Sequence, residues 1–187
     1  AMVVQHYVTK LLRPTEPAAG AWSKVKPSDI GVIPPYQRQA HKLRAALRAT
    51  GIRVDEDSGV KVGTTEVFQG QERRIIIIST VRSDESMLGE DTAVSVGFVG
   101  NPQRMNVAVT RARALVIVVG NPRVFAKDKW WGRWLEECIS LGCFCGQGLP
   151  IELSGNTSEA DEAYNALHGF LDTIVDKQNE AARRLEA

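Results

Sequence analysis

Apolar residues recur along this chain in two patterns. The first has the three-to-four spacing of an amphipathic helix, and it predicts helices over residues 3–12, 36–50, 102–112 and 130–141. The second consists of short β-branched or aliphatic runs bounded by turn residues, and it predicts strands at residues 30–33, 60–62, 75–81 and 115–119. Because the helices and strands alternate, we expect a three-layer α/β/α domain with a mainly parallel sheet.

Ligands of such sheets bind beyond the carboxyl ends of the strands. The loops that follow Ile33, Val62, Val81 and Val119 are therefore expected to form the functional edge. Residues 63–72 follow one of these strands, so their hydroxyl, amide and carboxylate groups are expected to lie at that edge.

A change of composition at Ser158 marks a second region. Ser158 and Asp161 fit a capping box, and apolar residues then recur at helical spacing towards Leu185. We therefore divide the chain into a domain over residues 1–153 and a C-terminal helical extension over residues 154–187. We expect the extension to pack against the domain, and partner binding through its apolar stripe is the alternative.

The composition limits the classes of protein that remain. Of the 187 residues, 43% are hydrophobic, and the 23 basic and 22 acidic side chains nearly cancel, which excludes binding to nucleic acid through a large excess of positive charge. No apolar run reaches the roughly 18 residues of a membrane span, and three cysteines are too few for a disulfide framework. We expect a soluble protein of the cytoplasm or the nucleus with no membrane partner.

Residues 63–72 hold the first concentration of polar chemistry. Thr64 and Thr65 offer hydroxyl donors for phosphate oxygens. Gln69 and Glu72 offer groups that can contact a ribose or orient a water near a phosphate. An ordinary polar loop is the alternative that this segment alone leaves open.

Residues 101–113 hold the second concentration of polar chemistry. Asn101 and Pro102 suit the cap and the first position of a helix. On that helix Arg104 and Arg111 are seven residues apart, so they are expected on nearly the same azimuth beside the apolar stripe. Two guanidinium groups held in this way can clamp a phosphate, and a solvated basic face is the alternative.

Together and in this order, these segments resemble the motifs of superfamily 1 helicases, in the branch of the up-frameshift and Armitage-like silencing RNA helicases. Residues 33–39 are similar to motif IV, residues 63–72 with 75–82 to motif V, and residues 97–113 with 118–122 to motif VI. The resemblance covers roughly residues 2–153. The segments Gln-Gly-Gln-Glu-Arg and Ser-Thr-Val-Arg-Ser are more similar to those of the Armitage-like group.

The resemblance implies the second RecA-like lobe of a two-lobed, ATP-dependent RNA helicase. Arg104 and Arg111 would be the catalytic residues that reach the γ-phosphate, with Arg111 the better candidate for the arginine finger. Thr64 would contact the RNA backbone, and we expect Thr65, the second hydroxyl donor of this segment, to contact it as well. The residues that would face the nucleotide are Tyr36, near the base, and Gln69, Gly70 and Glu72.

The resemblance also implies partners and a cofactor. The partners are single-stranded RNA and an N-terminal RecA-like lobe, and the cofactor is ATP with Mg²⁺ held by that other lobe. A DNA helicase lobe of the same superfamily is one alternative. A non-catalytic module that binds a partner through the C-terminal helix is another.

Elements needed for ATP hydrolysis are missing from the printed sequence. It contains no Gly-x-x-x-x-Gly-Lys-Ser/Thr segment, and Asp84 and Glu85 are not a convincing Mg²⁺ motif without one. We therefore expect this chain by itself to have no steady ATPase activity.

Two further clusters favour structural roles. Cys138, Cys143 and Cys145 lack the paired spacing of a zinc site, so we expect free thiols near a helix end and no metal. The tryptophans of the last predicted helix are expected to pack that helix onto the sheet, and a stacking platform for bases is the alternative: Trp130, Trp131 and Trp134.

Overall fold

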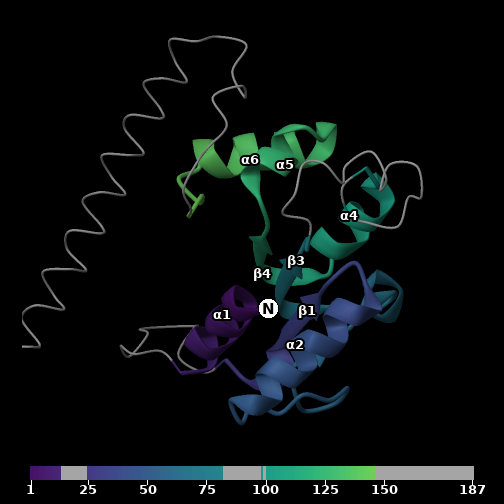
Figure 1. The fold of residues 1–187 in the computed structure, drawn as a ribbon, viewed down its shortest axis with the longest axis vertical. Helices are drawn as coiled ribbons and strands as arrows, with labels where there is room; N and C mark the ends of the chain where they lie inside the picture. The colour runs from purple at the N-terminus through teal and green to yellow at the C-terminus, as the bar shows by residue number, and fades with distance from the viewer. Residues whose placement is uncertain (14–24, 82–97, 99, 146–187) are drawn as a thin grey trace, which may run out of the picture.

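The computed structural model describes residues 1–13, 25–81, 98 and 100–145 (Figure 1). Its helices are α1 (Met2–Leu12), α2 (Gln37–Ala49), α4 (Pro102–Val109), α5 (Pro122–Ala126) and α6 (Lys129–Ser140), with short 3₁₀ turns η1 (Pro27–Asp29) and η2 (Thr65–Phe68). Its strands are β1 (Ile30–Ile33), β2 (Lys61–Val62), β3 (Arg73–Ser79) and β4 (Ala112–Val119).

The four strands form one parallel sheet in the order β2-β1-β3-β4. Ile30 pairs with Ile75, and Ile75 pairs with Leu115, so the strands are aligned almost residue for residue. The predicted α/β fold with a parallel sheet is confirmed. All four carboxyl ends therefore lie at one edge, the carboxyl edge, and the strand starts lie at the opposite, amino edge.

Helices cover both faces of the sheet, because successive residues of β3 point to opposite sides. Ile75 and Ile77 join a core formed with α1 and α2, and Ile76 and Ile78 join a second core. That second core is closed by η2, α4, α5 and α6, so β3 is buried on both faces, as its β-branched run predicts. Figure 1 shows α1 and α2 near one end of the view and α5 and α6 at the other.

The predicted helix over residues 102–112 is wrong at its C-terminal end. α4 stops at Val109, and β4 begins at Ala112 instead of at residue 115. Arg111 lies in the turn between them, where its carbonyl accepts a hydrogen bond from the Arg73 backbone N–H at 3.0 Å. Pairing with β3 therefore removes these residues from the helix, and β-branched neighbours such as Val109 and Thr110 favour that outcome.

Other boundaries also differ from the prediction. β3 begins at Arg73 and ends at Ser79, and Val81 has a positive φ of 67°, which takes it out of the strand. The short helix α5 was not predicted. The Asn121 side chain caps it by accepting a hydrogen bond from the Arg123 backbone N–H.

A close approach explains one glycine of β1. A Cβ placed on Gly31 would lie 2.7 Å from both Ile76 Cδ1 and Phe68 Cε1. Phe68 is the buried anchor of η2, so Gly31 lets the crossover between β2 and β3 lie against the sheet. This close contact fixes the distance between the sheet and the polar residues on either side of Phe68.

Three sequence-based expectations lie outside the described residues: the C-terminal helix that begins at Ser158, the loop between the first helix and strand, and the pair Asp84 and Glu85. Within the described ranges, no helix combines the length and apolar character that a membrane span requires.

Candidate functional site

The first part of the candidate site is a tight turn at the carboxyl edge, formed by Thr64, Thr65 and Glu66. We call it the threonine–glutamate turn. It follows β2 directly, with Thr64 at the N-cap position of η2. Both threonines are buried, each only 5% exposed, whereas the Glu66 side chain is 54% exposed. The turn therefore presents its carboxylate to solvent and keeps its hydroxyl groups beneath the surface.

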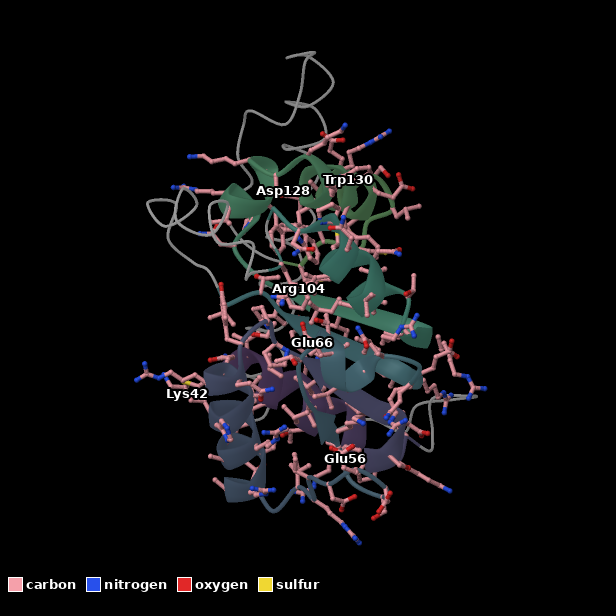
Figure 2. The ribbon with its side chains drawn as sticks, turned by 90° about the vertical axis from the view of Figure 1, so that its right-hand side faces the viewer. Lys42, Glu56, Glu66, Arg104, Asp128 and Trp130 are labelled. Atoms are coloured by element: carbon pink, nitrogen blue, oxygen red, sulfur yellow. The ribbon has the colours of Figure 1, made fainter. Side chains whose placement is uncertain are left out.

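An ion pair joins this turn to α4. Arg104 Nη2 lies 3.0 Å from Glu66 Oε1, and Figure 2 shows the two side chains approaching each other from neighbouring elements. The Asn101 side chain caps α4 by accepting a hydrogen bond from the Arg104 backbone N–H at 3.0 Å, as predicted. The two polar segments found in the sequence are thus connected by their own side chains.

The surroundings of Glu66 favour its ionised form. Partial burial raises the pKa of Glu66, but the Thr64 hydroxyl, its own backbone N–H, Arg104 and the Thr65 hydroxyl together outweigh burial and lower the pKa below its ordinary value of 4.5. The turn therefore stabilises the Glu66 carboxylate, to which the hydroxyl groups of both threonines donate.

We expect Glu66→Gln to lower the free energy of unfolding near neutral pH by at most about 1 kcal/mol, because water screens a half-exposed pair. The folded-state pKa is lowered, so this stabilisation is present above the ordinary pKa and is lost as the pH falls through the folded-state pKa. Urea denaturation across a pH series measures the difference. Glu136→Gln on the exposed side of α6 is the control. A Glu66→Gln effect that does not shrink on acidification would contradict this role.

A buried lysine holds the other end of the crossover. Lys61 in β2 is 2% exposed, and its Nζ lies 2.6 Å from Glu56 Oε2 and 2.5 Å from Gln71 Oε1. The ammonium also lies 5.4 Å from the centre of the Phe68 ring. A buried charge requires such partners. Lys61 therefore ties Gln71, the neighbour of Gly70 and Glu72, to the sheet.

The second part of the candidate site is a hollow at the amino edge, which we call the amino-edge hollow. It has a volume of about 550 Å³ and lies where β1, β3 and β4 begin. Its charged lining residues are Asp29, Glu72, Arg73, Arg74 and Arg113. Arginines outnumber carboxylates there, so the hollow is suited to an anion.

One arginine of this hollow has an unsatisfied donor. Arg73 hydrogen-bonds the carbonyl oxygens of Glu72 and Glu56, but its Nε is buried without a partner among the described residues. Buried donors in native proteins nearly always have partners. This donor is enclosed by protein, so it is the three arginines in the lining of the hollow that fit an anionic ligand.

Arg111 lies beside this hollow and away from Arg104. Its Nε donates to the Val107 carbonyl at 3.1 Å, and its Nη2 donates to Thr110 Oγ1 at 3.0 Å. The expectation that Arg104 and Arg111 share one face of a helix is wrong, because α4 ends before Arg111. Arg104 faces Glu66, whereas Arg111 is placed by the start of β4.

The remaining predicted residues divide between the two edges. Tyr36 follows β1 at the carboxyl edge, as the N-cap residue of α2, and is half-buried. Glu72 immediately precedes β3 at the amino edge, and Gln69 and Gly70 lie on the crossover between the edges. Gly70 has a φ of 69°, and a Cβ there would meet nothing within 4 Å, so this turn is open to solvent.

The structure therefore contradicts the expectation that all of residues 63–72 lie at the carboxyl edge. Tyr36, Thr64 and Thr65 lie at the carboxyl edge, whereas Glu72 and Arg111 lie at the amino edge. A short crossover over one face of the sheet connects the two edges, which is why residues adjacent in sequence separate in space.

Three residues of the site were not identified from the sequence. The sequence did mark Lys61 as unusual, because it is a cation between two valines of a strand predicted from its apolar residues. Glu66 had none that distinguished it from the other polar residues of its loop. The exposed Arg113 stood at the end of the arginine-rich segment, but only the position of β4 shows that it lines the hollow.

The cysteines lie at and just beyond the end of α6. Cys138, Cys143 and Cys145 are free thiols, and partial burial, with Cys143 and Glu137 nearby, raises the pKa of Cys138. In the part of the chain that the structure describes, no group of three or more histidines, cysteines or carboxylates is arranged to hold a metal ion.

Most of this chain is similar to proteins that are described as helicases. Residues 1–123 match the family described as AAA domain. The chain is 45% identical over 153 residues to putative helicase MOV-10 of Gallus gallus, covering 80% of this chain and 15% of that protein. It is 43% identical over 152 residues to probable RNA helicase armi of Drosophila melanogaster, covering 81% and 12%.

A more distant relative extends the comparison. ATP-dependent helicase upf1 of Schizosaccharomyces pombe is 38% identical over 121 residues, covering 64% of this chain and 12% of that protein. The chain thus spans only 12–15% of the length of these three relatives. The RecA-like assignment of the α/β domain is confirmed by the family match together with the parallel sheet.

Proposed function

Because this chain belongs to the Upf-like branch of superfamily 1 RNA helicases, we propose that residues 1–153 are the second RecA-like motor lobe of an ATP-dependent RNA helicase. Residues 154–187 would be a C-terminal extension. The observation that carries the proposal is the hydrogen bond from the Arg73 N–H to the Arg111 carbonyl. This bond puts the arginine of one helicase motif beside Glu72 of another, next to a hollow rich in arginine.

In this proposal the amino-edge hollow and Arg111 face a nucleotide held by another lobe. Arg111 supplies a fixed cation where charge spreads over the transferred phosphoryl group, which stabilises the transition state. Arg104 is proposed as a second cation that reaches the γ-phosphate. In this structure its guanidinium is paired with Glu66. Tyr36, Gln69, Gly70 and Glu72 remain proposed contacts to the nucleotide.

Mg²⁺ is assigned to the other lobe. The described residues hold no carboxylate cluster suited to a metal, and the printed sequence has no P-loop. When bound there with ATP, Mg²⁺ would neutralise phosphate charge. This lobe would contribute cations and hydrogen-bond donors.

The carboxyl edge is proposed to face single-stranded RNA. Thr64 and Thr65 are the proposed contacts to the RNA backbone; each is only 5% exposed, so a strand could contact only the small exposed part of each residue. Contacts to phosphates read no base sequence, so binding should be sequence-tolerant and weakened by salt. The protein is proposed to act in the cytoplasm or the nucleus.

We expect the purified 187-residue chain to bind a labelled oligoribonucleotide without hydrolysing ATP, because no segment of it can cradle a triphosphate. Joined to a P-loop lobe of the same family, it should give RNA-stimulated ATP hydrolysis, measured as phosphate release. The same chain carrying Arg111→Ala is the control for contaminating ATPases. Hydrolysis by the 187-residue chain that this substitution abolishes would contradict the proposal.

The same assay distinguishes RNA from DNA. An oligoribonucleotide should stimulate hydrolysis by the joined lobes more than the oligodeoxyribonucleotide of the same sequence. Stronger stimulation by DNA would favour the DNA helicase alternative.

A further inference from the structure

The tryptophans of α6 differ sharply in their surroundings. Trp131 is fully buried, stacked on Phe125 with ring centres 5.0 Å apart and edge-on to Phe98 at 6.3 Å. Its Nε1 donates to the Phe98 carbonyl at 3.1 Å. Trp134 is partly buried against the same core. Trp130, by contrast, is 47% exposed, so the core does not explain why it is an aromatic residue.

The start of α6 is held firmly. Asp128 Oδ1 accepts hydrogen bonds from the backbone N–H groups of Trp130 and Trp131, each at 2.9 Å. Its Oδ2 accepts one from Gly100 N–H at 2.7 Å, which ties α6 to the segment before α4. Together with the buried Trp131 ring, these bonds fix the position from which the Trp130 side chain extends (Figure 2).

Trp130 borders a hollow along α4, on a side of that helix where Met105 and Val109 also pack against the second core. Four residues of α4 line it at helical spacing, so they share one side of that helix. The hollow has a volume of about 350 Å³, and its lining residues are Pro102, Met105, Asn106, Val109 and Trp130. A flat aromatic ring beside a mainly apolar hollow is suited to a planar ligand group.

Two basic residues of α6 lie near Trp130 in the sequence of that helix. Lys129 Nζ lies 5.3 Å from the centre of the Trp130 ring, and exposed Arg133 follows one turn later on α6. The carboxylate of Asp128, two residues before Trp130, is engaged in the cap of α6. An apolar side chain of a protein partner would not require these cations, but the phosphates of a nucleic acid would.

The hollow lies on the side of the lobe proposed to face RNA. α5 begins directly after the carboxyl end of β4, and α6 follows α5. The threonine–glutamate turn follows the carboxyl end of β2 in the same parallel sheet. The turn and the start of α5 therefore both lie beyond the carboxyl edge of the sheet.

We propose that Trp130, the hollow beside it, Lys129 and Arg133 form a platform on which a base of single-stranded RNA stacks while the two cations contact neighbouring phosphates. We call this the Trp130 platform. It rests on the proposed function, because it adds a base contact to a lobe whose other RNA contacts are to the backbone. Stacking tolerates any base, so the platform adds affinity without sequence preference.

The test uses the 187-residue chain and two probes of equal length and charge, a fluorescein-labelled oligouridylate and the corresponding abasic ribose-phosphate oligomer. Trp130→Ala should weaken binding to the oligouridylate about tenfold and leave binding to the abasic oligomer unchanged. Trp130→Phe should retain most of the affinity but lose part of the tryptophan fluorescence quenching that RNA causes. Leu141→Ala, at an exposed apolar position after the same helix, is the matched control and should change neither.

Three outcomes would overturn the platform. If the wild-type chain binds neither oligomer, the RNA-binding part of the proposed function fails together with the platform. If the wild-type chain binds RNA and Trp130→Ala binds equally well, only the platform fails. If Trp130→Ala weakens both oligomers alike, Trp130 does not act by stacking. Because Trp130 is exposed, the variant should keep the wild-type unfolding midpoint, so a loss of affinity will not reflect unfolding.

Discussion

Arg111→Ala, in a protein that joins this lobe to a P-loop lobe, should lower the kcat of ATP hydrolysis by about 10³-fold or more. The guanidinium of Arg111 is placed by the start of β4, and among the contacts described it hydrogen-bonds only the Val107 carbonyl of α4 and the neighbouring Thr110 hydroxyl. A phosphoryl group can replace the Val107 carbonyl and the Thr110 hydroxyl as the acceptor of these two hydrogen bonds. Phosphate release under saturating ATP and RNA measures the effect, and RNA affinity should be little changed.

Two variants make this test specific. Arg111→Lys should recover only part of the activity, because an ammonium cannot offer the planar fork of donors. Arg104→Ala should cause a smaller loss than Arg111→Ala, since Arg104 is already paired with Glu66 at 3.0 Å. Wild-type turnover in Arg111→Ala, or equal losses at both positions, would contradict the assignment of Arg111 as the arginine finger.

Trp131→Ala should destabilise the 187-residue chain by about 3–5 kcal/mol. The substitution removes a fully buried ring that stacks on Phe125, and it removes one of two donors to the Phe98 carbonyl, which still accepts from the Asn101 backbone N–H at 3.3 Å. The loss is comparable with the whole stability of many small domains, roughly 5–15 kcal/mol. Urea denaturation followed by circular dichroism measures the change in the free energy of unfolding.

The adjacent tryptophan is the control. Trp130→Ala should change the free energy of unfolding by less than about 0.5 kcal/mol, because its side chain is 47% exposed and makes no buried hydrogen bond among the described contacts. Similar losses for the two variants would mean that α6 packs on the sheet in another way. The pair thus separates a role in the core from a role at the surface for neighbouring residues of one type.

The arrangement of helices and strands was largely predictable, because apolar spacing reports directly on burial. In β3, Ile75 to Ile78 form a continuous apolar run, and helices do cover both faces of that strand. The prediction was wrong where two tendencies competed. Residues 110–112 continue a helical pattern, but pairing between Arg73 and Ala112 draws them towards the sheet.

The segments that make up the site could be predicted, but their arrangement in space could not. The polar residues of the two helicase motifs could be named from the sequence. Their division between two edges could not, because it depends on a short crossover held over Gly31 by Phe68. The pairing of Arg104 with Glu66 likewise needs η2 and α4 to be neighbours on one face of the sheet.

The sequence by itself determined the fold class, the family and the identity of the chemical groups, since periodicity and ordered motifs are properties of the chain alone. Tertiary structure decided which groups meet. It buried Lys61 beside Gln71, separated Arg111 from Arg104, and left Trp130 at the surface while enclosing Trp131. The physical reason is that contacts between distant residues depend on strand order and on where each helix ends, and local patterns do not encode either one.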